Sequence, residues 1–211
     1  MAPSLAFPPG AFRRENEEDD RLFYASPRRV VHLDAPAIDA LSGLYGLLVP
    51  ARACVLDLMA SWRSHLPPSF AGTIIGLGLN RQEMQENPGL REAVVQDLNR
   101  EPTLPFNDAA FDAAVCAVSV QYLTRPVDVF QEVRRTLKPD GLFIVSFSNR
   151  CFPEKAVALW RAANDSQHVA LVVRYFDASG GLGGAWSQVS EYAHTPPAGD
   201  PLYAVWAARR P

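Results

Sequence analysis

Short apolar runs recur along the chain and alternate with amphipathic stretches. Each run is rich in Val, Ile, Leu or Phe and has the length of a single strand. Continuous apolar runs are typical of strands that are covered on both faces, as in a parallel sheet. We therefore predict five buried strands, at residues 53–59, 72–79, 92–98, 111–120 and 141–148.

Other stretches have the periodicity of amphipathic helices. Residues 34–50 and 125–141 repeat apolar side chains at helical spacing. In the second stretch, Pro126 suits the first helical turn and Gly141 is a stop signal. Between the fourth and fifth strands, this helix makes a right-handed parallel crossover.

Two further helices are expected after the fifth strand, at residues 153–163 and 166–180. Asp165 is a suitable N-cap for the second of them, and Gly180 or Gly181 is its expected stop.

The end of the chain has a different pattern. Residues 185–196 and 201–210 are strand-like and flank the turn sequence PAGD, which predicts an antiparallel hairpin. Five mostly parallel strands with helices between them, followed by a hairpin, indicate a doubly wound α/β sheet.

Length and composition favour a single globular domain. The chain has 211 residues, of which 48% are hydrophobic and 20% are charged. Residues 1–30 combine FPPG with the charged run RRENEEDD, so we expect an extended, solvent-facing lead-in followed by one domain at residues 31–211. Within this lead-in (residues 1–30), Phe23 and Tyr24 are expected to dock on the body, where the segment can act as a lid.

Charge and cysteine content exclude several classes of partner. The net charge of −3, with scattered basic pairs, gives no attraction to nucleic acid or to a membrane surface. Three widely spaced cysteines form neither a disulfide framework nor a zinc motif, and no close histidine pair suggests another metal. With no transmembrane-length apolar run, we expect a soluble, cytoplasmic protein without a bound metal.

In a doubly wound sheet, ligands bind at the carboxyl ends of the strands, so the residues after each strand are the candidate site. The sequence VLDL at residues 55–58, a second strand about 20 residues on, and the stretch from VVQDLNREPTLPF to EVRRTLKPDGLFIVSFSN (residues 94–149) resemble a class I S-adenosylmethionine-dependent methyltransferase. The similarity covers residues 50–150. It implies a Rossmann-like, seven-stranded sheet whose last two strands are the predicted hairpin.

The resemblance assigns the first strand to the methionyl end of the cofactor. Asp57 matches the acid at the end of that strand; without a ligand, its role is to cap the turn. The backbone of the following turn is expected to approach the cofactor, which is why the family uses glycines there. In this chain Met59, Ser61 and Arg63 occupy those positions.

The next two strand ends correspond to the ribose and the adenine. The family's ribose acid aligns with Gly78, so Asn80 is either a neutral substitute or the N-cap of a helix that begins at Arg81. Asp97 matches the acid that accepts from the adenine amino group, and the Leu98 amide matches the adjacent donor. The alternative for Asp97 is a turn-capping role.

The resemblance places the acceptor beyond the fourth and fifth strands. Ser119 and Tyr122 match positions between cofactor and acceptor, and Asn149 and Arg150 are candidate acceptor contacts. Tyr122 and Arg150 have alternative roles as a packing aromatic and an exposed surface residue. Cys151, which follows them, is reactive only if its thiol pKa is lowered.

For methyl transfer, a protein must mainly hold the acceptor in line with the methyl group and exclude water. Candidate bases or positioning groups are Tyr122, His65 and Tyr24. A small-molecule acceptor is the default expectation, because there is no basic surface and the lead-in can form a lid. S-adenosylmethionine is the expected cofactor.

Two other functions remain open. A methyltransferase fold without the glycine turn and the ribose acid can serve as a non-catalytic binding or scaffolding module. The sequence TIIGLGLNR, with Asp97 about 20 residues on, also imitates a nicotinamide dinucleotide fingerprint, although Arg81 takes the place of its third glycine.

Overall fold

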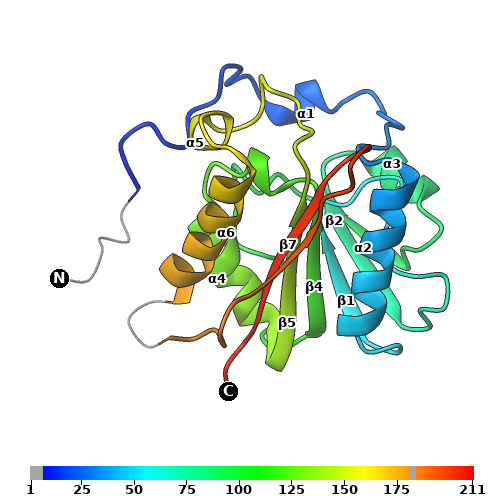
Figure 1. Ribbon diagram of the computed structural model, residues 1–211. Helices are drawn as coiled ribbons and strands as arrows, with labels where there is room; N and C mark the ends of the chain where they lie inside the picture. Colours follow the sequence, from blue (N-terminus) through cyan, green and yellow to red (C-terminus); the bar gives the residue numbers. More distant parts are fainter. Residues whose placement is uncertain (1–6, 181–183) are drawn as a thin grey trace.

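The computed structural model describes residues 7–180 and 184–211. They form a seven-stranded sheet in the order β3-β2-β1-β4-β5-β7-β6, in which β1 to β5 are parallel and β7 is antiparallel to both of its neighbours (Figure 1). The strands are β1 (Cys54–Leu58), β2 (Thr73–Gly78), β3 (Glu92–Val95), β4 (Phe111–Ala117), β5 (Leu137–Phe147), β6 (Ser190–His194) and β7 (Leu202–Ala208). The predicted α/β fold with its antiparallel hairpin is confirmed.

Helices cover both faces of this sheet, which explains why the strands are apolar without alternation. In β1, Val55 belongs to the core on the α2 side, whereas Leu56 and Leu58 belong to the core on the side of α4 and α6 (Figure 1). The helical segments are α1 (Asp20–Phe23), α2 (Ala35–Leu48), α3 (Arg81–Glu86), η1 (Val120–Tyr122), α4 (Pro126–Thr136), α5 (Ala158–Arg161) and α6 (Asp165–Gly180).

Three details of the helix predictions were wrong. The helix expected at residues 125–141 ends at Thr136, because the chain from Leu137 through Gly141 already belongs to β5. The helix expected at residues 153–163 is the short α5, because Lys155 turns its side chain into the interior and the Val157 N–H donates to the Gln121 carbonyl. Asn164, not Asp165, caps α6: its side-chain oxygen accepts from the Gln167 N–H at 3.0 Å. No helix in the ranges 7–180 and 184–211 is both long enough and apolar enough to cross a bilayer.

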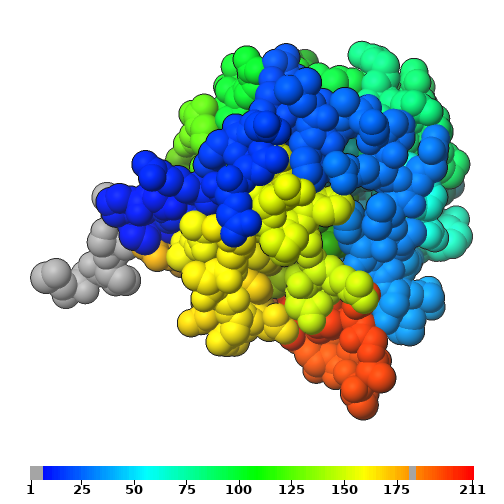
Figure 2. All heavy atoms as spheres, turned by 90° about the horizontal axis from the view of Figure 1, so that it is seen from above, coloured from blue at the N-terminus to red at the C-terminus, as the bar shows by residue number. Residues whose placement is uncertain are grey.

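The described part of the lead-in, residues 7–30, lies over the carboxyl ends of the strands (Figures 1 and 2). Seen from above, it runs beside the segment around residues 150–160, and the two exchange backbone hydrogen bonds, such as Asn16 N–H to the Glu154 carbonyl at 2.9 Å.

The charged run in this lead-in is not wholly solvent-facing. The Asp20 carboxylate is only 4% exposed and pairs with Arg14 at 2.7 Å and with Lys155, which is fully buried, at 2.9 Å. The expectation of an entirely solvated charged run was therefore wrong. A buried lysine far along the chain requires a carboxylate partner, and periodicity cannot reveal such a partner.

Candidate functional site

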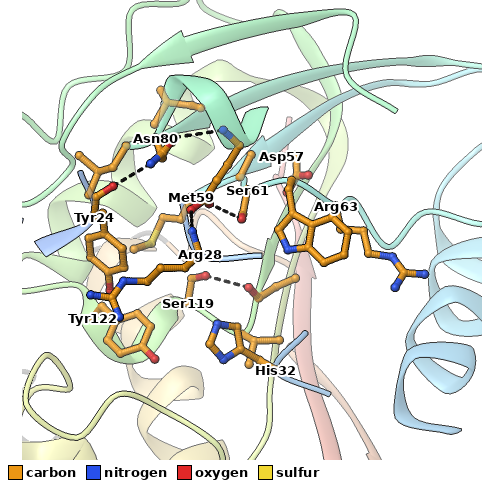
Figure 3. A pocket seen from close by; sticks show the side chains of 18 of the residues that line it. Tyr24, Arg28, His32, Asp57, Met59, Ser61, Arg63, Asn80, Ser119 and Tyr122 are labelled. Atoms are coloured by element: carbon orange, nitrogen blue, oxygen red, sulfur yellow. Dashed lines mark hydrogen bonds between the residues drawn. The ribbon is translucent and has the colours of Figure 1, made fainter. Parts of the chain in front are cut away.

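A cavity lies where the strand order reverses, between β1 and β4 at their carboxyl ends. The turn after β1, the ends of β2 and β4, the loop after β3 and the lead-in all contribute to its wall (Figure 3). The predicted site residues that line it are Tyr24, Asp57, Met59, Ser61, His65, Asn80, Asp97, Leu98, Ser119 and Tyr122. Chain topology thus brings most of the candidates together.

Asp57, near the end of β1, supplies a buried carboxylate. It is 5% exposed and accepts one hydrogen bond, from the Ser64 hydroxyl at 2.6 Å. Burial raises the pKa of this carboxyl to about 6, against the smaller opposing effect of Ser64. Because its negative charge has no cationic partner in the described chain, Asp57 is suited to receive a ligand cation.

The turn after β1 approaches β2 closely without any glycine. Met59 takes the left-handed conformation, with φ of 57°, that a glycine would adopt at no cost. The Ala60 N–H then donates to the Leu77 carbonyl at 2.8 Å, which ties the turn to β2. The N–H groups of Ser61 and Trp62 form no hydrogen bond within the described chain, so the turn leaves two backbone donors for a ligand.

This turn explains why the family's ribose acid is absent. A Cβ atom on Gly78 would lie 2.2 Å from the Ala60 carbonyl oxygen, so no side chain fits there. Gly76 lies in the same strand, against Leu90. Both glycines of the GLG sequence are thus strand positions required by packing, not parts of a phosphate-binding turn, and the dinucleotide fingerprint loses its structural basis.

Asn80 acts as a cap and as an anchor. Its side-chain oxygen accepts from the Glu83 N–H at 3.0 Å at the start of α3, and its amide donates to the Tyr24 carbonyl at 2.8 Å and the Ala25 carbonyl at 3.3 Å. Asn80 was expected either to cap this helix or to contact a ribose, and the structure shows the cap. The amide also fastens the lead-in.

Glu83 is a cavity residue that sequence analysis missed, as are Arg28 and His32. It is 6% exposed in the first turn of α3, where one carboxylate oxygen accepts from the Ser61 hydroxyl at 2.5 Å and the other from the Arg28 N–H at 2.6 Å. An acid three residues after Asn80 suggests a capping box, but Glu83 faces the cavity instead. Each oxygen retains an acceptor lone pair for a ligand hydroxyl.

The loop after β3 places a carboxylate beside a free backbone donor. One oxygen of Asp97 accepts from the Asn99 N–H at 2.9 Å, and burial raises the pKa of this carboxyl. The Leu98 N–H makes no hydrogen bond to the described residues. An acceptor and a neighbouring free donor therefore stand together at the cavity edge.

Aromatic side chains form the β4 side of the cavity. The Tyr122 ring stacks on Phe152 with centroids 6.1 Å apart, and its hydroxyl accepts from the Phe152 N–H at 2.8 Å. Burial raises the pKa of Tyr122 to about 12 and also raises that of Tyr24, so both phenols are protonated near neutral pH. The Ser119 hydroxyl donates to the Ala117 carbonyl at 2.8 Å.

His65 lines the cavity as a neutral imidazole. Burial lowers its pKa to about 4, with a further contribution from the charge of Arg63. Its Nδ1 atom is buried without a partner in the part of the chain that the structure describes. This nitrogen is therefore free to form a hydrogen bond with a ligand.

The residues proposed after β5 lie outside the cavity wall. Arg150 is 63% exposed and pairs with Asp200 at 2.7 Å, while Asn149 is exposed. Cys151 is half-buried, and burial raises its thiol pKa, against a smaller lowering by Arg161, so the structure gives no sign of an activated thiolate.

Known proteins share both sequence and fold with this chain. A family model described as "Methyltransferase domain" matches residues 67–145. The biotin biosynthesis bifunctional protein BioHC of Teredinibacter turnerae is 32% identical over 91 residues, which cover 42% of this chain. The matched part spans only 15% of the length of that relative. The turn after β1 precedes the segment that the family model matches.

Solved structures extend the likeness to most of the chain. A putative methyltransferase from Bacillus halodurans has a TM-score of 0.58 at 11% identity, covering 82% of this chain and 99% of that one. The [4+2]-cyclase SpnF has a TM-score of 0.59 at 14% identity, covering 90% of each chain. At such low identity these neighbours show the fold alone, and proteins of different activities share it.

Proposed function

Because the chain belongs to the class I S-adenosylmethionine-dependent methyltransferase family, we propose that it binds S-adenosylmethionine in this cavity and transfers the methyl group to a small-molecule acceptor. The observation that carries the proposal is the set of unsatisfied backbone donors beside buried carboxylates. The N–H groups of Ser61, Trp62 and Leu98 have no hydrogen-bond partner in the described chain. Asp57 has no cationic partner among the described residues.

These groups suit the three parts of the cofactor. Asp97 and the Leu98 amide would hold the adenine, by an acceptor and a donor on the same edge of the ring. Glu83 would accept from the ribose hydroxyls, in place of the acid that cannot fit at Gly78. Asp57 and the turn at Ser61 would bind the charged methionyl end, since a buried carboxylate attracts an ammonium group.

When bound, the cofactor supplies an electrophilic methyl group. The protein holds the acceptor in line with that group and excludes water from the cavity. The hydroxyls of Tyr24 and Tyr122 remain protonated, so they would orient an acceptor by hydrogen bonding. His65 is neutral at pH 7, and its unsatisfied Nδ1 makes it a candidate positioning group. The lead-in would act as the lid that excludes water.

Titration calorimetry with S-adenosylmethionine and S-adenosylhomocysteine tests cofactor binding. We expect Asp97→Ala and Glu83→Gln each to weaken binding by about tenfold, the loss of roughly one charged hydrogen bond. Asp128→Ala, which removes an exposed ion pair with Arg125 on α4, is the matched control and should leave affinity unchanged. Absence of binding to the wild-type protein at about 1 mM cofactor would refute the proposal.

A second candidate function is a binding module without methyl transfer. It is favoured by the lead-in, whose backbone already occupies one Glu83 oxygen through Arg28 and both amide protons of Asn80 through Tyr24 and Ala25. If the wild-type protein does not bind the cofactor but a variant with residues 1–30 deleted does, this interpretation is the better one.

A further inference from the structure

Arg28 lines the cavity and, like Arg63 on its other side, has no acidic partner among the described residues. Arg14 and Lys155 pair with Asp20, and Arg29 pairs with Glu86 at 2.6 Å. Arg28 is half-buried and forms no ion pair with any side chain in residues 7–180 or 184–211. Among the described residues, its only side-chain hydrogen bond runs from one terminal nitrogen to the Phe23 carbonyl, at 3.0 Å.

Two aromatic rings fix the position of the guanidinium group. Its central carbon lies 4.1 Å from the centroid of Phe23 and 5.3 Å from that of Phe152. Such stacking holds the plane of the group but satisfies none of its N–H donors. The Nε atom is buried without a partner, and the second terminal nitrogen has no acceptor among the described residues.

The Arg28 side chain crosses the cavity toward its β4 side. Figure 3 shows its guanidinium beside the rings of Tyr24 and Tyr122, away from Asp57 and Arg63. In the proposed function, the acceptor binds on this β4 side, and the methionyl end of the cofactor lies toward Asp57. Arg63, stacked on Trp62 at 5.8 Å, is a separate cation on that other side.

No described carboxylate pairs with the guanidinium, and the other acids of the cavity wall are Asp57, Glu83 and Asp97. Tyr24 and Tyr122 are neutral phenols, and burial lowers the pKa of His32, which packs edge-on against Phe152. Asp20, the carboxylate beside Tyr24, already faces two cations. An incoming carboxylate would therefore form charged hydrogen bonds with the free guanidinium donors in a partly desolvated site, where such bonds are strong.

We propose that Arg28 binds a carboxylate of the methyl acceptor, so that the substrate is a small carboxylic acid with a planar group packed on Phe152 and Tyr122. A planar guanidinium with free donors matches the two oxygens of a carboxylate. The inference rests on the proposed function, because it treats the β4 side of the cavity as the acceptor site. The carboxylate of the cofactor itself is the other possible source of such an anion.

Fragment binding to the full chain distinguishes the two sources. Benzoate, succinate and acetate, with benzamide as the neutral isostere of benzoate, would be titrated by NMR in the presence and absence of S-adenosylhomocysteine. We expect benzoate to bind at least about tenfold more tightly than benzamide, and Arg28→Gln to abolish this preference. Arg28→Lys should retain part of it, because the charge remains but the planar fork is lost.

Arg29→Gln is the matched control: it removes the neighbouring, exposed arginine and should leave both affinities unchanged. The proposal is overturned if no carboxylate binds wild-type protein more tightly than benzamide at about 10 mM, or if Arg28→Gln keeps the preference. It is also overturned if Arg28→Gln weakens S-adenosylhomocysteine by about tenfold without affecting benzoate, since the anion is then the cofactor's own. Benzoate selectivity without S-adenosylhomocysteine binding would refute the proposed function and leave the anion site standing.

Discussion

Burial of the Asp57 carboxylate costs folding free energy, although the same carboxylate is proposed to bind the ligand. Its carboxyl has one hydrogen bond, from Ser64, and its folded-state pKa of about 6 lies above the ordinary value of 3.8. Folding therefore favours the protonated form, so this group costs no stability below about pH 4 and costs progressively more as the pH rises to 6. The free protein carries this cost until a cation binds beside the carboxylate.

Replacing Asp57 with Asn should therefore stabilise the unliganded protein above pH 6 but not at pH 4. Each pKa unit corresponds to about 1.4 kcal/mol, so the gain approaches about 3 kcal/mol at pH 8, reduced by any loss of the Ser64 contact. Urea unfolding of the variant and the wild type at pH 4 and pH 8 measures it. Asp128→Asn, on the exposed face of α4, should show no such dependence. An equal difference at both pH values would contradict the assignment.

At the scale of elements, the contact between the β1 turn and β2 decides the form of the site. The turn rests on Gly78, so the strand cannot carry the usual acid, and α3 supplies Glu83 instead. In the proposed site, Glu83 would thus replace the strand acid as a consequence of how one turn packs. It is not evidence that the cavity has lost its use.

Gly78→Ala should destabilise the protein by about 1–3 kcal/mol, because its Cβ atom meets backbone that cannot rotate away. It should also weaken cofactor binding by displacing the turn at Ser61. The matched control is Gly43→Ala in α2, where nothing lies within 4 Å of the new Cβ atom. That change should raise stability by about 0.5–1 kcal/mol. Thermal unfolding and calorimetry of both variants provide the comparison.

Sequence patterns predicted the elements better than the contacts between them. The five strands and α4 follow from local periodicity, and Asp57 and Asp97 follow from their places at strand ends. Glu83 escaped prediction because its orientation depends on Ser61 and Arg28, which are remote in sequence. Whether Asn80 caps α3 or binds a ribose likewise depended on the lead-in, whose docking rests on long-range contacts.

At the scale of the whole molecule, the lead-in is fastened at several points around the cavity. Its Asp20 meets Lys155 in the interior and accepts from the Asn99 amide at 2.9 Å, beside the proposed adenine site. The Trp62 indole, from the β1 turn, donates to the Val30 carbonyl at 3.2 Å. We therefore predict that opening of this segment and entry of a ligand are coupled.

Asp20→Ala should destabilise the lead-in by about 3–5 kcal/mol, because it leaves Lys155 buried without a carboxylate. Hydrogen exchange should then accelerate at the amide of Asn16, which bonds to the 150–160 segment, more than in the central strands. The double variant Asp20→Ala with Lys155→Met should recover part of the loss. Uniformly faster exchange throughout the chain would contradict a local role.

The hydrogen bonds that tie Asn80 and Glu83 to the lead-in have a thermodynamic consequence for any ligand. If a ligand binds only to molecules in which the lead-in has detached from Asn80 and Glu83, the observed dissociation constant equals the intrinsic one divided by the fraction of molecules with a detached lead-in. Measured affinity then understates the strength of the contacts inside the cavity. A substitution that loosens the lead-in can tighten binding without touching the ligand.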